Sequence, residues 1–323
     1  METLSGVKLK LLCLLVVVCS SISACSTRLD NKYNIAELDA GKVYSNEEGL
    51  KADGFAASLC VPEDVEAFNT EGVNAEAFAL YDLTDKKVIS QKNSFEKVYP
   101  ASTTKILTCL VALENSKLDD IVTVPEESAI TVSGSSMAAL RPGDQLSMRD
   151  LLYGLMVPSG NDAAVAIAHH ISGSVDGFSK LMNEKAREVG ATHSNFINPH
   201  GLPDEDHYTT VYDMYLIFQE ALKNEDFLNI ANQKEYTSKV ISAEGQERDV
   251  VWKNGNGFLS GRFSLPDGIN ITAGKTGHTS KAGFCLVLSE SSNDGHDYIS
   301  IVMKAPVYEE LYGGMSALIS KGR

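Results

Sequence analysis

Short runs of apolar residues predict strands in two separate parts of the chain. The run Ala75–Leu83 is followed by a turn at 84–85 and by a second run at 87–90, which is the spacing of a β-hairpin. Further runs, each bounded by turn-forming residues, lie at 269–272, 284–288 and 298–302. Both parts of the chain are therefore expected to contribute strands to a sheet.

Apolar residues recur with helical spacing through the middle of the chain. Pro100 ends extended structure, and Ser102 then opens a helical pattern that continues to Leu113. Other helical patterns lie at 148–156, 162–171, 175–189, 212–223 and 308–319. Strands first, helices in the middle, and strands with a helix last predict one α+β domain with a mainly antiparallel sheet.

The first 24 residues have the pattern of an export signal. Lys8 and Lys10 precede an apolar run at 11–18, and small residues then lead to Cys25. The run is shorter than the roughly 20 apolar residues that span a bilayer. Residues 22–25, Ile-Ser-Ala-Cys, resemble the bacterial lipobox, in which the cysteine is lipidated and becomes the mature N-terminus. We expect an exported protein anchored by lipid on Cys25 at the outer face of the cytoplasmic membrane. The alternative is secretion after ordinary signal cleavage.

The next segment lacks the periodicity of a folded region. Residues 25–57 carry mixed charge with Asn, Ser and Gly and few apolar positions, a composition typical of a flexible tether. The sequence thus predicts a signal peptide at 1–24, a membrane tether at 25–57 and a folded domain at 58–323.

Charge and cysteine content exclude two classes of protein. The formal net charge of −15 argues against nucleic acid as a partner, because Lys and Arg must neutralise its phosphates. Outside the signal and Cys25, the cysteines are Cys60, Cys109 and Cys285. At most one disulfide is possible among them, so we expect buried free thiols and not a disulfide scaffold.

The segment Ser102-Thr-Thr-Lys105 carries a candidate nucleophile and base. Residues three apart share a helix face, so Lys105 is expected beside the Ser102 hydroxyl. A serine hydroxyl is a poor nucleophile until a base removes its proton, and Lys105 is a base only when neutral. Burial and a nearby second cation lower a lysine pKa, and Lys275 could be that cation. The backbone N–H of Ser102 at the helix start is a candidate oxyanion donor.

Two further motifs supply polar groups at the expected site. Ser159-Gly-Asn161 lies between two apolar helical patterns and predicts a tight corner that aims both side chains inward. Lys275-Thr-Gly277 lies on a predicted strand, and the glycines on either side of it, at 274 and 277, would let a substrate backbone approach and pair with it. In this arrangement Lys275 provides positive charge and Thr276 a hydroxyl for a terminal carboxylate.

Taken in this order, the three motifs resemble those of the low-molecular-weight penicillin-binding proteins that act as serine D-alanyl-D-alanine carboxypeptidases. The resemblance runs from about Ala75 to the C-terminus. Its other segments are Tyr99–Lys105, Pro158–Ala164, Asn198–Pro203, Tyr208–Thr210, Asp213-Met214 and Gly274–Thr279. It implies the fold of serine β-lactamases and penicillin-binding transpeptidases, with a five-stranded antiparallel sheet packed with helices and an inserted helical subdomain.

The resemblance also implies an activity and a partner. A serine-type carboxypeptidase removes the terminal D-alanine of peptidoglycan stem pentapeptides through an acyl-enzyme, here on Ser102. β-Lactams would acylate the same serine, and no metal or other cofactor is implied. Lys105 would act as base, and Ser159 would relay a proton between Lys105 and the leaving amine.

Substrate positioning is implied for the remaining motif residues. Asn161 and Lys275 would hold the substrate, and Thr276 would contact its terminal carboxylate. Gly277 would admit the substrate backbone, and the backbone N–H of His278 would join that of Ser102 in an oxyanion hole. An arginine that helps to bind this carboxylate in some relatives has no equivalent in Asn254-Gly-Asn256. Arg262 could substitute for it.

Four alternatives remain open. A class A-like β-lactamase needs a glutamate base for deacylation, and Glu184, Glu188 and Glu205 lack the expected neighbours. A DD-endopeptidase would use the same fold and site. A surface lipoprotein could bind peptidoglycan without cleaving it. A zinc hydrolase would draw on a group of metal-ligand types, namely His193, His200, Asp204, Asp206 and His207.

Overall fold

The computed structural model describes residues 44–45, 51–52, 57–62 and 66–322. The chain divides into two compact units, Met1–Ala57 and Ser58–Arg323. In the first unit, β1 (Tyr44–Ser45) pairs antiparallel with β2 (Lys51–Ala52). The predicted signal peptide and its Cys25 lie outside the described residues.

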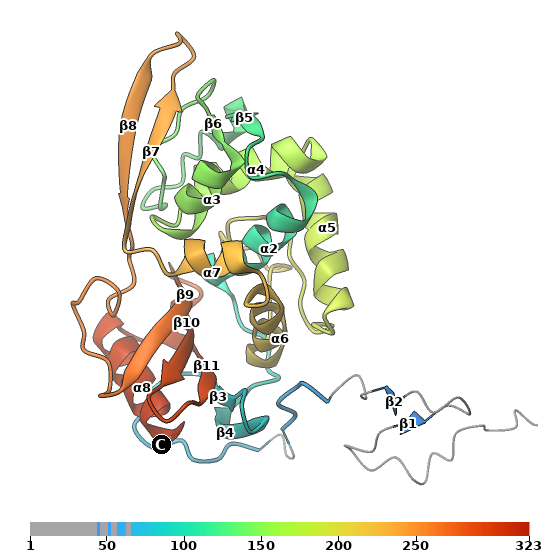
Figure 1. The fold of residues 1–323 in the computed structure, drawn as a ribbon, viewed down its shortest axis with the longest axis vertical. Coiled ribbons are helices and arrows are strands. Elements are labelled where there is room, and N and C mark those ends of the chain that lie inside the picture. The colour runs from blue at the N-terminus through green and yellow to red at the C-terminus, as the bar shows by residue number, and fades with distance from the viewer. Residues whose placement is uncertain (1–43, 46–50, 53–56, 63–65, 323) are drawn as a thin grey trace, which may run out of the picture. The chain divides into compact units, whose positions relative to one another are not determined.

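A five-stranded antiparallel sheet forms the centre of the second unit (Figure 1). Its strand order is β4-β3-β11-β10-β9, so strands from the two ends of the sequence pair in one sheet, as predicted. The strands are β3 (Ala77–Asp82), β4 (Lys87–Lys92), β9 (Ile269–Thr279), β10 (Gly283–Ser292) and β11 (Asp297–Ala305). The strand that carries the Lys-Thr-Gly motif, β9, lies at an edge of the sheet.

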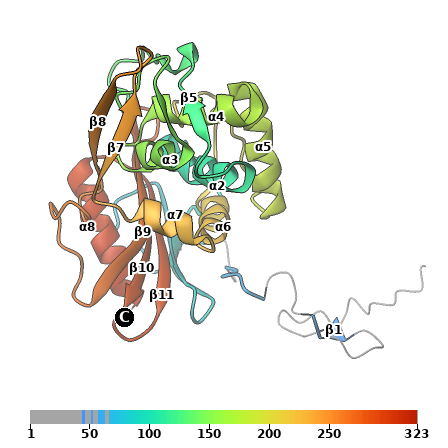
Figure 2. The same cartoon turned by 45° about the horizontal axis from the view of Figure 1, so that its top comes forward.

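Both faces of this sheet are buried, because successive side chains of a strand point to opposite faces. In β11, Ile299, Ile301 and Met303 join the larger core on one face. Tyr298 and Val302 join a smaller core on the other face, under α8 (Tyr308–Ile319). Figure 2 shows α8 on one side of the sheet and the remaining helices on the other.

All but the last of the helices between the strands lie close to their predicted ranges, and the last, at 225–231, was not predicted. They are α2 (Lys105–Asn115), α3 (Met148–Met156), α4 (Asn161–Ser172), α5 (Val175–Glu188), α6 (Val211–Ala221) and α7 (Glu225–Ala231). The α+β class is therefore confirmed, and α3 and α8 have the predicted bounds. The helix expected to open at Ser102 differs, because residues 101–104 form the 3-10 turn η2 (Ala101–Thr104) and α2 begins at Lys105.

A second antiparallel sheet was not predicted. Its order is β5-β6-β7-β8, with β5 (Ile121–Thr123), β6 (Gln145–Ser147), β7 (Glu235–Ile241) and β8 (Glu247–Lys253). The long hairpin β7–β8 extends beside α3 in Figure 1. Trp252 of β8 connects this sheet to the loop that precedes β6, since its indole N–H donates to the Ala138 carbonyl at 2.8 Å. The short turns η3 (Glu126–Ser128) and η4 (Ser320–Gly322) complete the described elements.

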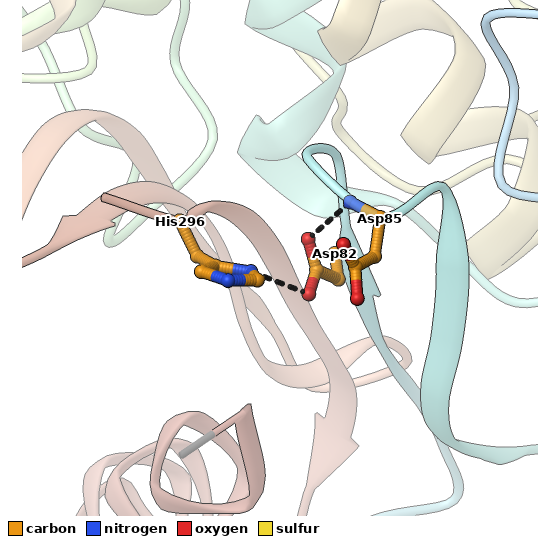
Figure 3. Close-up of side chains that lie close together, drawn as sticks. All are labelled: Asp82, Asp85 and His296. Carbon is orange, nitrogen blue, oxygen red and sulfur yellow. Dashed lines mark hydrogen bonds and ion pairs between the residues drawn. The ribbon is translucent and has the colours of Figure 1, made fainter. Parts of the chain in front are cut away.

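A small polar cluster joins two neighbouring turns of the central sheet (Figure 3). Asp82 Oδ1 accepts hydrogen bonds from the backbone N–H groups of Thr84 and Asp85, and Asp82 Oδ2 lies 2.9 Å from His296 Nδ1. The ligand-type atoms of Asp82, Asp85 and His296 lie within 4.8 Å of one another. Because Asp82 already caps the β3–β4 turn and pairs with the β10–β11 turn, these contacts are explained by their structural role.

One expectation about the second unit can be checked directly. Cys60, Cys109 and Cys285 are free and buried, as predicted. Among the described residues, no helix has both the length and the apolar content needed to cross a bilayer.

Candidate active site

The backbone around Ser102 is held in an unusual conformation. Ala101 has a φ of 47°, in the left-handed region that residues with a side chain rarely adopt. Gly201 packs directly on it, since a Cβ at Gly201 would lie 1.8 Å from the Ala101 carbonyl oxygen. That oxygen also accepts a hydrogen bond from Thr104 Oγ1 at 2.8 Å. Tertiary contacts thus fix the turn that presents Ser102, as is common at functional sites.

Lys105 lies fully buried beside Ser102. Its Nζ is 3.0 Å from Ser102 Oγ, 2.7 Å from Asn161 Oδ1 and 2.8 Å from the His200 carbonyl oxygen. Burial, and to a smaller extent the nearby Lys275, hold the pKa of Lys105 well below its usual range. A neutral amine can donate to Asn161 and to the His200 carbonyl, which leaves its lone pair facing the Ser102 hydroxyl. The geometry therefore suits proton transfer from Ser102 to Lys105.

The Ser159-Gly-Asn161 corner connects α3 to α4. Ser159 has a φ of 64°, and a Cβ at Gly160 would lie 2.7 Å from the Gly154 carbonyl oxygen. Asp162 holds the corner to a neighbouring loop, because its carboxylate accepts the backbone N–H groups of Ala138 and Leu140 at 2.8 and 3.0 Å. This close packing explains how two polar side chains face the site between two buried helices.

The Lys-Thr-Gly motif lies on β9, as predicted, and β9 packs against the turn of Ser102. A Cβ at Gly277 would lie 3.0 Å from the Ser102 backbone nitrogen, so a larger residue would push the strand away. Lys275 Nζ donates to Ser159 Oγ at 2.9 Å and to the Thr276 carbonyl at 3.0 Å. Burial lowers the pKa of Lys275 to about 7. Among the described hydrogen bonds, Ser159 is thus paired with Lys275 and not with Lys105.

Two cavities meet at Ser102. The first, which we call the Asn161 cavity, has a volume of about 380 Å³. The second, which we call the Ser159 cavity, has a volume of about 240 Å³ and is also lined by Thr276 and Gly277. His278 lines both cavities. The candidate nucleophile therefore stands between two spaces, as a group that cleaves a bond within a chain requires.

The described lining of these cavities contains no carboxylate. The Asn161 cavity is bounded by a loop at 132–136, by residues 200–203 and by residues 278–281. The wall of the Ser159 cavity includes the apolar or aromatic side chains of Val157, Phe284, Tyr308 and Leu311. Arg262 does not line either cavity, but its guanidinium lies 5.6 Å from the centre of the Tyr308 ring.

The histidines considered for zinc do not converge. His200 Nδ1 accepts the Leu202 backbone N–H at 3.1 Å. His207 is buried between the Ile197 backbone N–H and Thr104 Oγ1, at 3.2 and 2.9 Å. Within the described part of the chain, the side chains that do converge as possible ligands are those of Asp82, Asp85 and His296. The predicted histidine group is therefore engaged in separate structural contacts.

Several parts of the site were not predicted. The His200 carbonyl, which accepts from Lys105, is a backbone group and has no signature in the residue types. The loop at 132–136 lines both cavities, yet it reads as an ordinary Ser/Gly-rich turn. Gly201 could have been singled out, since His-Gly in the segment 198–203 belongs to the resemblance described above.

The sequence is similar to those of known D-alanyl-D-alanine carboxypeptidases. Residues 64–307 match the family described as D-alanyl-D-alanine carboxypeptidase. The carboxypeptidase DacF of Bacillus subtilis is 34% identical over 246 residues, which cover 75% of this chain and 60% of that protein. DacC of Escherichia coli is 34% identical over 271 residues, which cover 80% and 64%. The chain thus spans less than two thirds of the length of these relatives.

Two solved structures of penicillin-binding peptidases also resemble this protein. The DD-transpeptidase of Streptomyces has a TM-score of 0.73 at 28% identity and aligns over 79% of this chain and 99% of its own. Penicillin binding protein 5 of Haemophilus influenzae has a TM-score of 0.68 at 32% identity, with 77% and 71% covered.

Proposed function

The chain belongs to the D-alanyl-D-alanine carboxypeptidase family of serine peptidases, and from this membership we propose its reaction. It removes the terminal D-alanine of peptidoglycan stem peptides through an acyl-enzyme on Ser102. The observation that carries the proposal is the set of contacts made by Lys105, whose buried Nζ lies 3.0 Å from Ser102 Oγ and is otherwise bound by Asn161 and the His200 carbonyl.

Acylation begins with proton transfer from Ser102 Oγ to the neutral Lys105 Nζ. The serine oxygen attacks the carbonyl carbon of the penultimate D-alanine and forms a tetrahedral intermediate. The backbone N–H groups of Ser102 and His278 stabilise the oxyanion. The close packing of Gly277 on the Ser102 nitrogen supports this role, because it brings β9 beside the start of the turn.

Collapse of the intermediate breaks the peptide bond and needs a proton on the leaving amine. Ser159 relays this proton: its hydroxyl gives a proton to the amine and takes one from the Lys105 ammonium, which returns to its neutral form. Lys275 hydrogen-bonds to Ser159 and keeps its own charge. The protonated Lys275 and the Thr276 hydroxyl hold the carboxylate of the departing D-alanine in the Ser159 cavity.

Deacylation requires water to attack the ester. The described lining of both cavities lacks a carboxylate that could activate this water, in contrast to the glutamate of class A β-lactamases. β-Lactams therefore acylate Ser102 and remain bound for a long time. This argues against the β-lactamase alternative, whereas an endopeptidase activity on cross-linked peptides would use the same groups.

The proposed substrate places the enzyme outside the cytoplasm. The export signal at 1–24 and the lipobox-like Ile-Ser-Ala-Cys25 support attachment by lipid to the outer face of the cytoplasmic membrane. Residues 25–57 then act as the tether of the catalytic domain at 58–323. Globomycin, which inhibits the lipoprotein signal peptidase, tests the anchor. It should turn the wild type from mature protein into uncleaved precursor and should leave the processing of Cys25→Ala unchanged.

The catalytic proposal is tested by labelling with a fluorescent penicillin and by D-alanine release from a pentapeptide. Ser102→Ala should abolish both signals, and Lys105→Ala should slow labelling by at least about a hundredfold, since a general base contributes 10²–10⁴. Ser320→Ala, on the exposed end of α8, is the matched serine control. Retained D-alanine release by Ser102→Ala would refute the assignment of the nucleophile.

A further inference from the structure

Lys281 stands alone as a charged side chain in the Asn161 cavity. Among the described lining residues of this cavity, the others are neutral or are histidines, and no carboxylate is present. We infer that Lys281 makes the enzyme select acyl groups that carry a carboxylate on the residue preceding D-Ala-D-Ala. This inference rests on the proposed function and narrows its substrate class.

The two cavities receive different halves of the substrate. The terminal carboxylate is drawn to the Ser159 cavity, where Thr276 lies in the wall and Lys275 binds Ser159. The rest of the peptide must then leave Ser102 on the opposite side, into the Asn161 cavity. An extended peptide can pair with β9, which lies at an edge of the sheet. Such a peptide follows the chain from His278 toward Lys281, so its third residue from the C-terminus lies near this lysine.

Lys281 is available to bind an anion. Its side chain is exposed, and it has no ion-pair partner among the described residues. Its Nζ lies 5.6 Å from the centre of the Tyr99 ring, within the range of a cation–π contact. Because Tyr99 precedes Ser102 by three positions, this contact holds the ammonium group close to the nucleophile's segment.

The charges around the Asn161 cavity favour an anionic side chain near Lys281. The whole chain carries a formal net charge of −15, whereas the described lining of this cavity contains no carboxylate. Exposed acidic residues Asp204, Glu205 and Asp206 follow directly after Pro203 in the wall, but they lie outside the lining. A short anionic side chain that ends within the cavity meets Lys281 first. A cationic side chain would be favoured only if Asp204, Glu205 and Asp206 acted on it more strongly than Lys281 does.

Three N-acetylated peptides of the form X-D-Ala-D-Ala provide the test, with L-glutamate, L-glutamine or L-lysine at X. Glutamate and glutamine have the same shape and differ in charge. For the wild type, we expect kcat/KM for the glutamate peptide to exceed that for the glutamine peptide two- to fivefold, the size of a partly exposed ion pair. The ratio should fall toward one as salt is raised, because salt screens exposed charges.

Variants at Lys281 identify the residue responsible. Lys281→Met keeps the length of the side chain and should bring the glutamate-to-glutamine ratio to one. Lys281→Glu should move the preference to the lysine peptide. Lys239→Met removes the same charge from the exposed face of β7 and should keep the wild-type ratio.

The outcomes separate this inference from the function on which it rests. A glutamate-to-glutamine ratio that is unchanged in Lys281→Met, or a wild-type preference for the lysine peptide, overturns the role of Lys281 and leaves the carboxypeptidase proposal intact. Failure to release D-alanine from any peptide, by protein that a penicillin still labels at Ser102, contradicts the proposed carboxypeptidase reaction and this inference with it.

Discussion

Glu290 lies in the core of the central sheet and gives a stability prediction of calculable size. It shares a face of β10 with Leu286 and Leu288, which belong to the core under α8. Ser300 donates a hydrogen bond to its Oε1, and among the described residues its Oε2 has no partner. Burial raises the pKa of Glu290 from 4.5 to about 8. The folded protein therefore holds this carboxyl in its protonated form at neutral pH.

The sign and size of the effect follow from linkage. Below pH 4.5 the carboxyl is protonated in both folded and unfolded chains and has no effect. Between pH 4.5 and about 8 only the folded chain keeps the proton. The folding equilibrium constant therefore falls about tenfold for each pH unit in this range, and the contribution of Glu290 is constant above pH 8. The whole change is roughly 5 kcal/mol, and about 3 kcal/mol of it is reached at pH 7.

Glu290→Gln removes this titration while keeping the shape of the side chain. Urea unfolding at several pH values between 5 and 9 measures the free energy of unfolding of both proteins. The free energy of unfolding of the wild type minus that of the variant should fall steadily with pH and level off near pH 8. This trend is expected even if the substitution also changes stability by an amount that does not depend on pH. Exposed Glu127→Gln is the matched control for the chemical change. A difference that does not vary with pH would show that the reasoning about this buried carboxyl is wrong.

Three further predictions concern backbone sterics, substrate binding and the paired turns. Gly201→Ala should abolish penicillin labelling and strongly lower the melting temperature, because its Cβ would lie 1.8 Å from the Ala101 carbonyl oxygen. Gly245→Ala also has a positive φ but no atom within 4 Å, so it should cost only about 1 kcal/mol, and equal losses in the two variants would contradict the steric argument. The KM for a D-Ala-D-Ala peptide should rise as pH increases through about 7, because Lys275 loses the charge that holds the carboxylate; a KM that is constant from pH 6 to 9 would exclude that role. The hydrogen bond to Asp82 raises the pKa of His296, so its stabilising effect is complete below the unfolded pKa and is lost as pH rises through the folded one. In melting experiments His296→Gln should therefore destabilise the protein more at pH 5.5 than at pH 8.5, and the reverse order would count against the pairing.

The fold was predictable where apolar periodicity is strong. Met148–Met156 and Tyr308–Ile319 have the predicted bounds because their apolar residues lie on one helix face. The turn before α2 was not predictable, since the left-handed conformation of Ala101 depends on contact with the distant Gly201. The exposed hairpin β7–β8 was missed because apolar and polar residues occur on both its inward and its outward positions, so its alternation is weak.

The same distinction applies to the site. The proximity of Ser102 and Lys105 follows from their spacing along one turn. By contrast, the hydrogen bond from Lys275 to Ser159 joins residues 116 positions apart, and it depends on how β9 packs against the α3–α4 corner. The contact of Lys105 with the His200 carbonyl is equally non-local and involves a backbone atom. Residue types therefore indicated the chemistry, whereas tertiary packing determined the partners.

The central claim is that Lys105 is uncharged in the resting enzyme and can accept the proton of Ser102. Carbon-13 NMR of the lysine Cε atoms measures this directly, with the Lys105 signal assigned by its absence from Lys105→Arg. We expect a Lys105 signal with the chemical shift of a neutral amine at pH 7 and a titration midpoint well below that of the exposed lysines. A Lys105 signal that keeps the shift of an ammonium group up to pH 10 would contradict it.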